Sequence, residues 1–250
     1  MPTLRFVLEY DGTDFAGWQA QAPGARTVQG ELEAALLRVT GAAVRVVGAG
    51  RTDAGVHAEG QVASCRIETR LDAATLARAL NAVLPPDLAV RSAQQAPEGF
   101  DARRDARRKL YRYRVWNGPV RSPLRARTHA FVRAPLDVDA MRRAAATLAG
   151  RHDFASFETR RREPGRAGAS TVRTLFRVEI LGASGGEVVF EIEGDGFLRY
   201  MVRGLVGTLL EIGRGERPEA DVTRILGARD RRAAGVTAPA RGLVLVRVEG

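Results

Sequence analysis

The chain has 250 residues, of which 45% are hydrophobic and 27% are charged, so it can bury a sizeable core as one large domain or two subdomains. This composition excludes a fibrous protein. The net charge of +10 attracts polyanions, which favours nucleic acid as the partner over an anionic membrane or a merely solvated basic surface.

The cysteine and lysine content further limits the kinds of site that the chain can form. Cys65 is the only cysteine, and no His or Cys pair has the spacing of a zinc site, so we expect neither a disulfide nor a structural zinc ion, and no catalytic metal. Lys109 is the only lysine, and arginine, whose flat guanidinium binds phosphate bidentately, supplies the other 38 basic side chains. No apolar signal segment and no run of about 18 apolar residues occurs, so we expect a cytoplasmic protein without contact to a membrane.

The first part of the chain predicts alternating strands and helices. Apolar periodicity distinguishes the two, and turn signals such as Asp11-Gly12 and Pro85-Pro86 separate them. The predicted strands span residues 4–10, 44–47, 61–67 and 88–91. One predicted helix spans residues 27–39, and a second follows a cap at Leu71-Asp72.

The second part repeats this alternation. Tyr111, Tyr113 and Val115 alternate with more polar neighbours, which is the period of a strand. The predicted strands span residues 109–116, 172–181, 187–193 and 243–248. Two predicted helices span residues 137–148 and 197–212, and a short final helix is predicted to start at Pro218.

Each part contains a strand, a turn and an amphipathic helix in that order. We therefore predict an α+β fold with a mixed, mainly antiparallel sheet flanked by helices, built from two related α+β halves with a central basic cleft. The N-terminal half, residues 1–104, carries a loop with an Arg-Thr-Asp sequence. The C-terminal half, residues 105–250, is expected to complete the cleft.

That loop, residues 48–57, places Asp53 beside Arg51 in a glycine-dense turn. An isolated acid in a strongly basic chain needs a specific reason, and nucleophilic catalysis on RNA is one. The alternative is an Asx turn or a helix cap. The glycines fit neither the phosphate-binding loop nor the dinucleotide fingerprint, so spacing alone leaves both interpretations of Asp53 open.

Two basic segments predict contact with RNA. Seven of the residues 103–114 are basic and are interleaved with tyrosines, so arginines can meet phosphates while rings stack on splayed bases. The alternative is a solvated amphipathic strand in which Tyr113 belongs to the core. The second segment runs from Arg160 to Arg166 and is either a phosphate clamp or an ordinary solvated loop.

The predicted helix 197–212 carries two arginines at the edge of its apolar stripe. Arg199 and Arg203 lie one turn apart there, and Arg203 either pairs with a buried acid or lays its stem along the core. Gly204 and Gly207 lie near these arginines and have no side chain, which predicts a close approach of another backbone to the helix.

Several motifs, spread across nearly the whole chain, resemble those of the tRNA pseudouridine synthase A family and follow one another in the same order as in that family. The run from Gly50 to His57 is the most specific of them. The others are Tyr10-Asp11-Gly12-Thr13 with Gly17-Trp18-Gln19, Tyr111-Arg112-Tyr113, and Phe197-Leu198-Arg199-Tyr200-Met201-Val202-Arg203.

The resemblance implies a homodimeric isomerase that converts uridine to pseudouridine at positions 38, 39 and 40 of the tRNA anticodon stem and loop, without a cofactor. Asp53 would be the catalytic nucleophile and would attack either C1′ of the sugar or C6 of the uracil. Tyr111 would stack on the uracil and Arg203 would keep Asp53 ionised. Arg51 would help to displace the base, and Leu243 would line the pocket.

Two other functions stay open at this point. A non-catalytic RNA-binding protein would use the same basic surface and would not need Asp53. A nucleoside glycosidase is less favoured, because such enzymes usually use two carboxylates and no second acid is obviously paired with Asp53.

Overall fold

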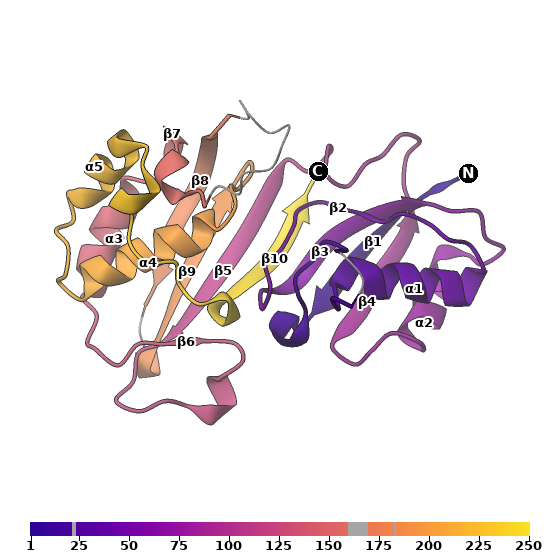
Figure 1. Cartoon of the computed structure of the whole chain (residues 1–250), viewed down its shortest axis with the longest axis horizontal. Helices are drawn as coiled ribbons and strands as arrows, with labels where there is room; N and C mark the ends of the chain where they lie inside the picture. The colour runs from indigo at the N-terminus through magenta and orange to yellow at the C-terminus, as the bar shows by residue number, and fades with distance from the viewer. Residues whose placement is uncertain (22–23, 160–169, 183) are drawn as a thin grey trace. The chain divides into compact units, whose positions relative to one another are not determined.

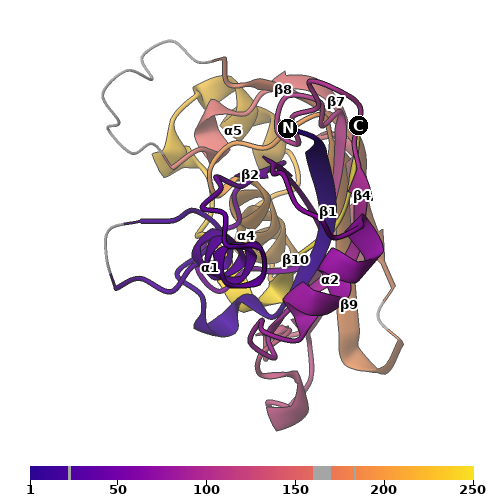
Figure 2. The same ribbon diagram turned by 90° about the vertical axis from the view of Figure 1, so that its right-hand side faces the viewer.

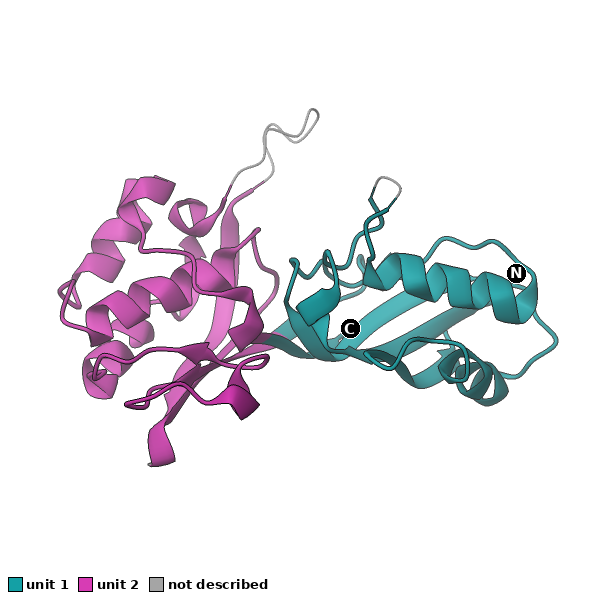
Figure 3. Cartoon of the chain, turned by 60° about the horizontal axis from the view of Figure 1, so that its bottom comes forward, with its two compact units in different colours: residues 1–109, 244–250 teal, residues 110–243 magenta. Residues whose placement is uncertain are grey.

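The computed structural model describes residues 1–21, 24–159, 170–182 and 184–250. The chain divides into two compact units, shown in different colours in Figure 3. Unit 1 contains residues 1–109 and 244–250, and unit 2 contains residues 110–243. Within the described ranges, no helix combines the length and the apolar character needed to cross a membrane.

Unit 1 is built on strands in the order β4, β1, β3 and β10, with β2 also paired to β3. The pairs β1–β3, β1–β4 and β2–β3 are antiparallel, whereas β3 and β10 are parallel. The strand bounds are β1 (Thr3–Tyr10), β2 (Val47–Gly48), β3 (His57–Arg66), β4 (Leu88–Gln95) and β10 (Leu243–Glu249).

The core of unit 1 lies under helix α1 (Val28–Thr40). In β1, Leu4, Phe6 and Leu8 are buried and alternate with less buried residues, as expected for a strand with one covered face. Figure 2 shows α1 on one side of β1 and β4. Thr27, the first residue of the predicted helix 27–39, instead caps α1 by accepting a hydrogen bond from the backbone N–H of Gly30.

Helix α2 (Ala73–Asn81) packs against β4. Asp72 caps its N-terminus, as predicted. The amide of Asn81 makes hydrogen bonds to both backbone groups of Val90, which satisfies the outer edge of that strand.

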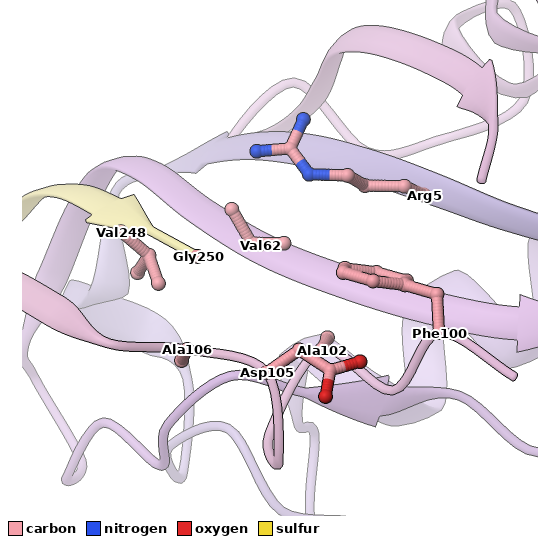
Figure 4. A pocket seen from close by; sticks show the side chains of 8 residues that line it. All are labelled: Arg5, Val62, Phe100, Ala102, Asp105, Ala106, Val248 and Gly250. Carbon is pink, nitrogen blue, oxygen red and sulfur yellow. The ribbon is translucent and has the colours of Figure 1, made fainter. Parts of the chain in front are cut away.

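The segment that follows β4 covers the other face of the strands. The backbone N–H of Ala102 donates to Ser64 Oγ on β3 at 3.1 Å. Figure 4 shows Phe100 and Asp105 of this segment beside Arg5 and Val62, where they line a small pocket.

Two strands of unit 1 are longer than predicted. Strand β3 begins at His57 rather than at residue 61, because Val244 and Leu245 of β10 pair with its first two residues. Strand β4 extends to Gln95 rather than to residue 91, because pairing with β1 fixes its polar end. Both extensions come from partners distant in sequence, which local periodicity does not show.

Unit 2 contains most of β5 and all of β9, β8 and β7, in that order, with β6 paired to β5 (Figure 1). The pairs β7–β8 and β8–β9 are antiparallel, and β5–β6 is parallel. The bounds are β5 (Arg108–Trp116), β6 (Ala130–Phe131), β7 (Gly150–Asp153), β8 (Val172–Leu181), β9 (Glu187–Gly194), α3 (Val138–Ala146), α4 (Met201–Gly213) and α5 (Asp221–Ala228).

Helix α4 begins four residues later than the predicted helix 197–212. Tyr200 precedes it with φ 62°, in the left-handed region that a non-glycine residue seldom adopts, so the helix starts at Met201. The prediction that places Arg199 on this helix is therefore wrong. The apolar residues Phe197 and Leu198 continue the helical pattern but lie in the irregular segment before the helix.

The predicted fold class is confirmed in both units. Each contains strands of mixed, mainly antiparallel pairing together with helices that pack on them. Val244–Gly250, which end the chain, belong to unit 1, so the last strand returns to the unit that carries the Arg51–Asp53 loop.

Candidate active site

Side chains and backbone groups of unit 1 hold the carbonyls of the loop that carries Asp53. Lys109 Nζ donates to the carbonyl of Ala49 at 2.8 Å, and Gln61 Nε2 donates to the carbonyl of Gly50 at 3.0 Å. The backbone N–H of Trp18 donates to the carbonyl of Thr52 at 3.0 Å. The backbone on both sides of Arg51 is therefore fixed.

A buried polar cluster supports the same loop. The hydroxyls of Tyr10 and Thr52 share a hydrogen bond of 2.8 Å, and Gln61 Nε2 also donates to the Tyr10 hydroxyl at 3.4 Å. Burial raises the pKa of Tyr10 to about 12, against the hydrogen bonds from Thr52 and Gln61, so the phenol stays neutral near pH 7. Among the described residues, Gln61 Oε1 is buried and accepts no hydrogen bond.

His57 ends the loop and is buried. Its Nδ1 accepts a hydrogen bond of 3.1 Å from the backbone N–H of Gly12 and lies 3.1 Å from a carboxylate oxygen of Asp11. His57 thus ties the loop to the turn after β1.

Two glycines allow the loop to pack closely. Gly17 has φ 101°, and a Cβ there would lie 2.8 Å from the carbonyl oxygen of Thr52. A Cβ on Gly48 would lie 2.4 Å from the ring of Trp18, which is buried. Larger residues at either position would displace the loop.

The result is a fixed turn with two different side chains at its centre. Thr52 is buried, whereas Arg51 is exposed and Asp53 is half-buried. The turn closes after Asp53, whose carbonyl accepts from the backbone N–H of Val56 at 3.1 Å. A carboxylate at the surface of a rigid loop beside an exposed guanidinium can act as a nucleophile toward an anionic substrate.

In unit 2, Tyr111 lies on β5 and is 7% exposed. Its ring meets the ring of Phe197 edge to face, with centroids 5.1 Å apart and an angle of 85° between the planes. This contact fixes the orientation of the phenol. Phe197 lies in the irregular segment before α4 and not in the helix, where the sequence places it, and its ring contacts Tyr111.

Arg203 lies in the first turn of α4 and is held at both its backbone and its side chain. Its Nε donates to the carbonyl of Ala238 at 2.7 Å, and its own carbonyl accepts from the N–H of Ala238 at 3.0 Å. The guanidinium carbons of Arg203 and Arg199 each lie 4.9 Å from the ring centroid of Tyr200. The two arginines therefore gather at one aromatic ring, although Arg199 is not helical.

The segment 236–243 leads to Leu243, which is 5% exposed. The Tyr113 hydroxyl donates to the carbonyl of Pro239 at 2.7 Å, and a Cβ on Gly242 would lie 2.6 Å from the Tyr113 ring. Tyr113 is 1% exposed, so the alternative that it belongs to the core is confirmed. Burial raises the pKa of Tyr113 above its ordinary value, against the positive charges of Arg203 and Arg241.

The sequence comparisons decide the family. The model of the family described as tRNA pseudouridine synthase matches residues 7–105 and residues 144–249. The chain belongs to this family. Two matched segments, one early and one late in the chain, agree with the predicted pair of related halves.

Curated relatives named tRNA pseudouridine synthase A align along nearly the whole chain. The relative from Myxococcus xanthus is 49% identical over 248 residues, which cover 99% of this chain and 92% of the relative. The relative from Moorella thermoacetica is 48% identical over 255 residues, covering 100% of both chains. The relative from Pelobacter propionicus is 47% identical over 249 residues, covering 99% of both.

As a member of the tRNA pseudouridine synthase family, the chain is an isomerase that acts on uridine in tRNA. This finding selects the catalytic function over the non-catalytic RNA-binding and glycosidase alternatives. The basic composition is consistent with a tRNA substrate, as the sequence predicts.

The structure places the predicted site residues in two groups. Arg51 and Asp53 share the fixed loop of unit 1, and Tyr111, Arg203 and Leu243 belong to unit 2. The segment from residue 160 to 166, predicted as a basic clamp or loop, lies outside the described residues.

Sequence reasoning did not identify two residues that support the loop. Gln61 stands as a polar residue in an otherwise apolar strand pattern, and Lys109 is the only lysine of the chain. Both signals are visible in the sequence, but neither indicates a hydrogen bond to the carbonyls of Ala49 and Gly50.

Proposed function

We propose that the chain isomerises uridine to pseudouridine at positions 38, 39 and 40 of the tRNA anticodon stem and loop, with Asp53 as the nucleophile. The observation that supports this most directly is the fixed loop, in which the carbonyls before and after Arg51 are held and Asp53 is half-buried. The loop also carries the family motif from Gly50 to His57. A pre-oriented nucleophile loses little freedom when it reacts.

The proposed chemistry needs no cofactor. The Asp53 carboxylate adds to C1′ of the ribose or to C6 of the uracil, and the bond between N1 and C1′ breaks. The detached uracil turns so that C5 faces C1′, and a bond between C5 and C1′ forms. The proton on C5 leaves, N1 gains a proton, and the carboxylate is released, so the product is an isomer of the substrate.

The other matched residues receive the roles that the family resemblance implies. Arg51, exposed beside Asp53, helps to displace the target base from its stack, which costs a few kcal/mol. Tyr111 stacks on the uracil, Leu243 contacts it, and Arg203 keeps the nucleophile ionised. The edge-to-face contact of Tyr111 with Phe197 supports this role, because it restricts the ring before substrate arrives.

The assembly and location of the enzyme form a second part of the proposal. We propose a homodimer, because a tRNA whose anticodon arm enters one site leaves its body to contact another basic surface. A sedimentation-equilibrium mass of twice 27.0 kDa would support the dimer, and a single chain mass at micromolar protein would contradict it. We propose the cytoplasm as its location, because that compartment holds the tRNA pool.

The decisive experiment measures tritium release from transcripts labelled at uracil C5. Asp53→Asn should abolish release, whereas the control Asp139→Asn, which changes an exposed acid on α3, should retain it. Transcripts with cytidine at position 38, 39 or 40 test the target positions. Equal release by wild type and Asp53→Asn would remove Asp53 from the mechanism, and release that survives all three replacements together would overturn the target site.

A further inference from the structure

Lys109 is an exception in this chain. It is the only lysine among 39 Lys and Arg residues, and Arg107, Arg108 and Arg112 surround it in sequence. A lysine ammonium is a compact point charge with three donors, whereas a guanidinium is a wider planar fork suited to phosphate. Lys109 therefore differs in charge geometry from the 38 arginines of the chain.

The contacts of Lys109 show what its ammonium group holds. Its side chain is half-buried, and Nζ donates to the carbonyl of Ala49 at 2.8 Å. A Cβ on Gly50 would lie 3.4 Å from Nζ, so the ammonium packs directly against this glycine. A charged donor to a backbone carbonyl makes one of the stronger hydrogen bonds in proteins.

This bond acts on the segment just before the proposed catalytic pair. The carbonyl of Ala49 is two residues before Arg51, and Gln61 holds the next carbonyl, that of Gly50. The two bonds together fix consecutive peptide groups. Lys109 is also the second residue of β5 and precedes Tyr111 by two positions, so the residue that holds the loop lies on the strand that carries Tyr111.

We propose that Lys109 is a positioning residue that holds the Arg51–Asp53 loop through the carbonyl of Ala49, and that it does not serve as a phosphate contact like the arginines around it. The inference rests on the proposed function of Asp53 as the nucleophile. Removal of the ammonium should slow the chemical step while tRNA affinity stays nearly unchanged.

The test compares three variants with wild type under single-turnover conditions, with tRNA affinity measured at several salt concentrations. Lys109→Met removes the donor at similar length, and Lys109→Arg keeps a charged donor. Arg66→Met, at the exposed end of β3, removes one positive charge elsewhere in unit 1. Hydrogen–deuterium exchange of the peptide 49–56 reports on loop order without any need for activity.

We expect Lys109→Met to slow the single-turnover rate by about 10-fold to 100-fold, which corresponds to loss of a charged hydrogen bond. Its tRNA Kd should stay within about twofold of wild type, with the same salt dependence. Exchange in peptide 49–56 should rise. Lys109→Arg should be faster than Lys109→Met, and Arg66→Met should match wild type in rate and in exchange.

Two results would overturn the inference. A weaker Kd with a salt slope reduced by about 1 and an unchanged single-turnover rate would make Lys109 a phosphate contact. Normal exchange in peptide 49–56 together with a normal rate in Lys109→Met would show that the bond to Ala49 holds nothing of consequence. Failure of the proposed function is separate from both, because it would appear as tritium release by Asp53→Asn or as no release by wild type.

Discussion

The loop 49–56 of unit 1 and the segment 236–239 of unit 2 are both irregular backbone whose carbonyls accept hydrogen bonds from side chains. They differ in which residues donate. The loop is held by Lys109 and Gln61, which are not among the predicted site residues, whereas Arg203, a predicted site residue, holds Ala238 of the segment itself. The proposed site residues of unit 1 can therefore be changed without removing these two supports, whereas a change of Arg203 also removes one support of its segment.

The segment of unit 2 depends further on one close backbone contact. A Cβ on Gly207 of α4 would lie 1.7 Å from the carbonyl oxygen of Val236. Gly207→Ala should therefore destabilise the protein by at least about 3 kcal/mol, because backbone must move to make room. Urea unfolding followed by circular dichroism measures this loss.

Gly204, one turn earlier in α4, gives the matched control. The nearest atom to a Cβ there is 3.6 Å away, which is an ordinary contact. Gly204→Ala should stabilise the helix by about 0.5 to 1 kcal/mol, because alanine favours a helix more than glycine does. Equal stabilities of the two variants would show that the segment does not need its close approach to α4.

Arg203 offers a sharper test of the difference between the two regions. Arg203→Met should lower the free energy of unfolding by about 2 kcal/mol, because it removes a charged donor to the Ala238 carbonyl. Asp53→Asn keeps the shape of its side chain and should change stability by less than about 1 kcal/mol. Urea midpoints of both variants, measured beside tritium release, separate lost folding from lost chemistry.

A result in which Arg203→Met is as stable as wild type and still inactive would place the role of Arg203 in chemistry alone. In that case the contrast with unit 1 would disappear. A large loss of stability in Asp53→Asn would show that Asp53 also supports the fold of unit 1, and the contrast would disappear for that reason instead.

Much of the fold was predictable because it depends on local periodicity and caps. Thr27, Asp72 and Asp137 each cap a helix close to where the sequence predicts one, and β8 has the predicted bounds. The predictions failed where distant residues decide the structure. The start of β3 depends on pairing with β10, and the left-handed conformation of Tyr200, which delays α4, has no glycine to signal it.

The same division applies to the candidate site. The run from Gly50 to His57 could be assigned from the sequence, because its residue types follow one another directly. The hydrogen bonds from Gln61 and Lys109 join residues 11 and 60 positions apart, so only the fold reveals them. The glycines of α4 show both outcomes, because the predicted close approach is confirmed at Gly207 but not at Gly204.

Alkaline pH should weaken unit 1 through two buried groups. Burial raises the pKa of the Cys65 thiol to about 12, with a smaller contribution from the negative charge of Glu33, and burial raises the pKa of Tyr10 to about 12. In the unfolded chain, both groups lose their protons at a lower pH than in the folded protein. Their contribution to stability is therefore complete below pH 9 for Cys65 and below pH 10 for Tyr10, and it is lost as the pH rises toward 12.

Between pH 8 and pH 10 we expect a loss of about 1 to 2 kcal/mol, most of it from Cys65. Urea unfolding at these two pH values measures it. Cys65→Ala should flatten the dependence, since it removes the group with the lower unfolded pKa. An unchanged slope in Cys65→Ala would show that the buried thiol does not govern alkaline stability.

Two hydroxyl deletions, one in each region, should each destabilise the protein only slightly. Tyr10→Phe removes the bond to Thr52 under the loop, and Tyr113→Phe removes the bond to the Pro239 carbonyl. Each should cost about 1 kcal/mol, the usual net value of one hydrogen bond. Their stabilities should be alike, but hydrogen–deuterium exchange should rise only in peptide 49–56 for Tyr10→Phe and only in peptide 236–243 for Tyr113→Phe. Increased exchange in both peptides for either variant would mean that the two regions are held as one cooperative unit, and the separate supports described for them would no longer explain their order.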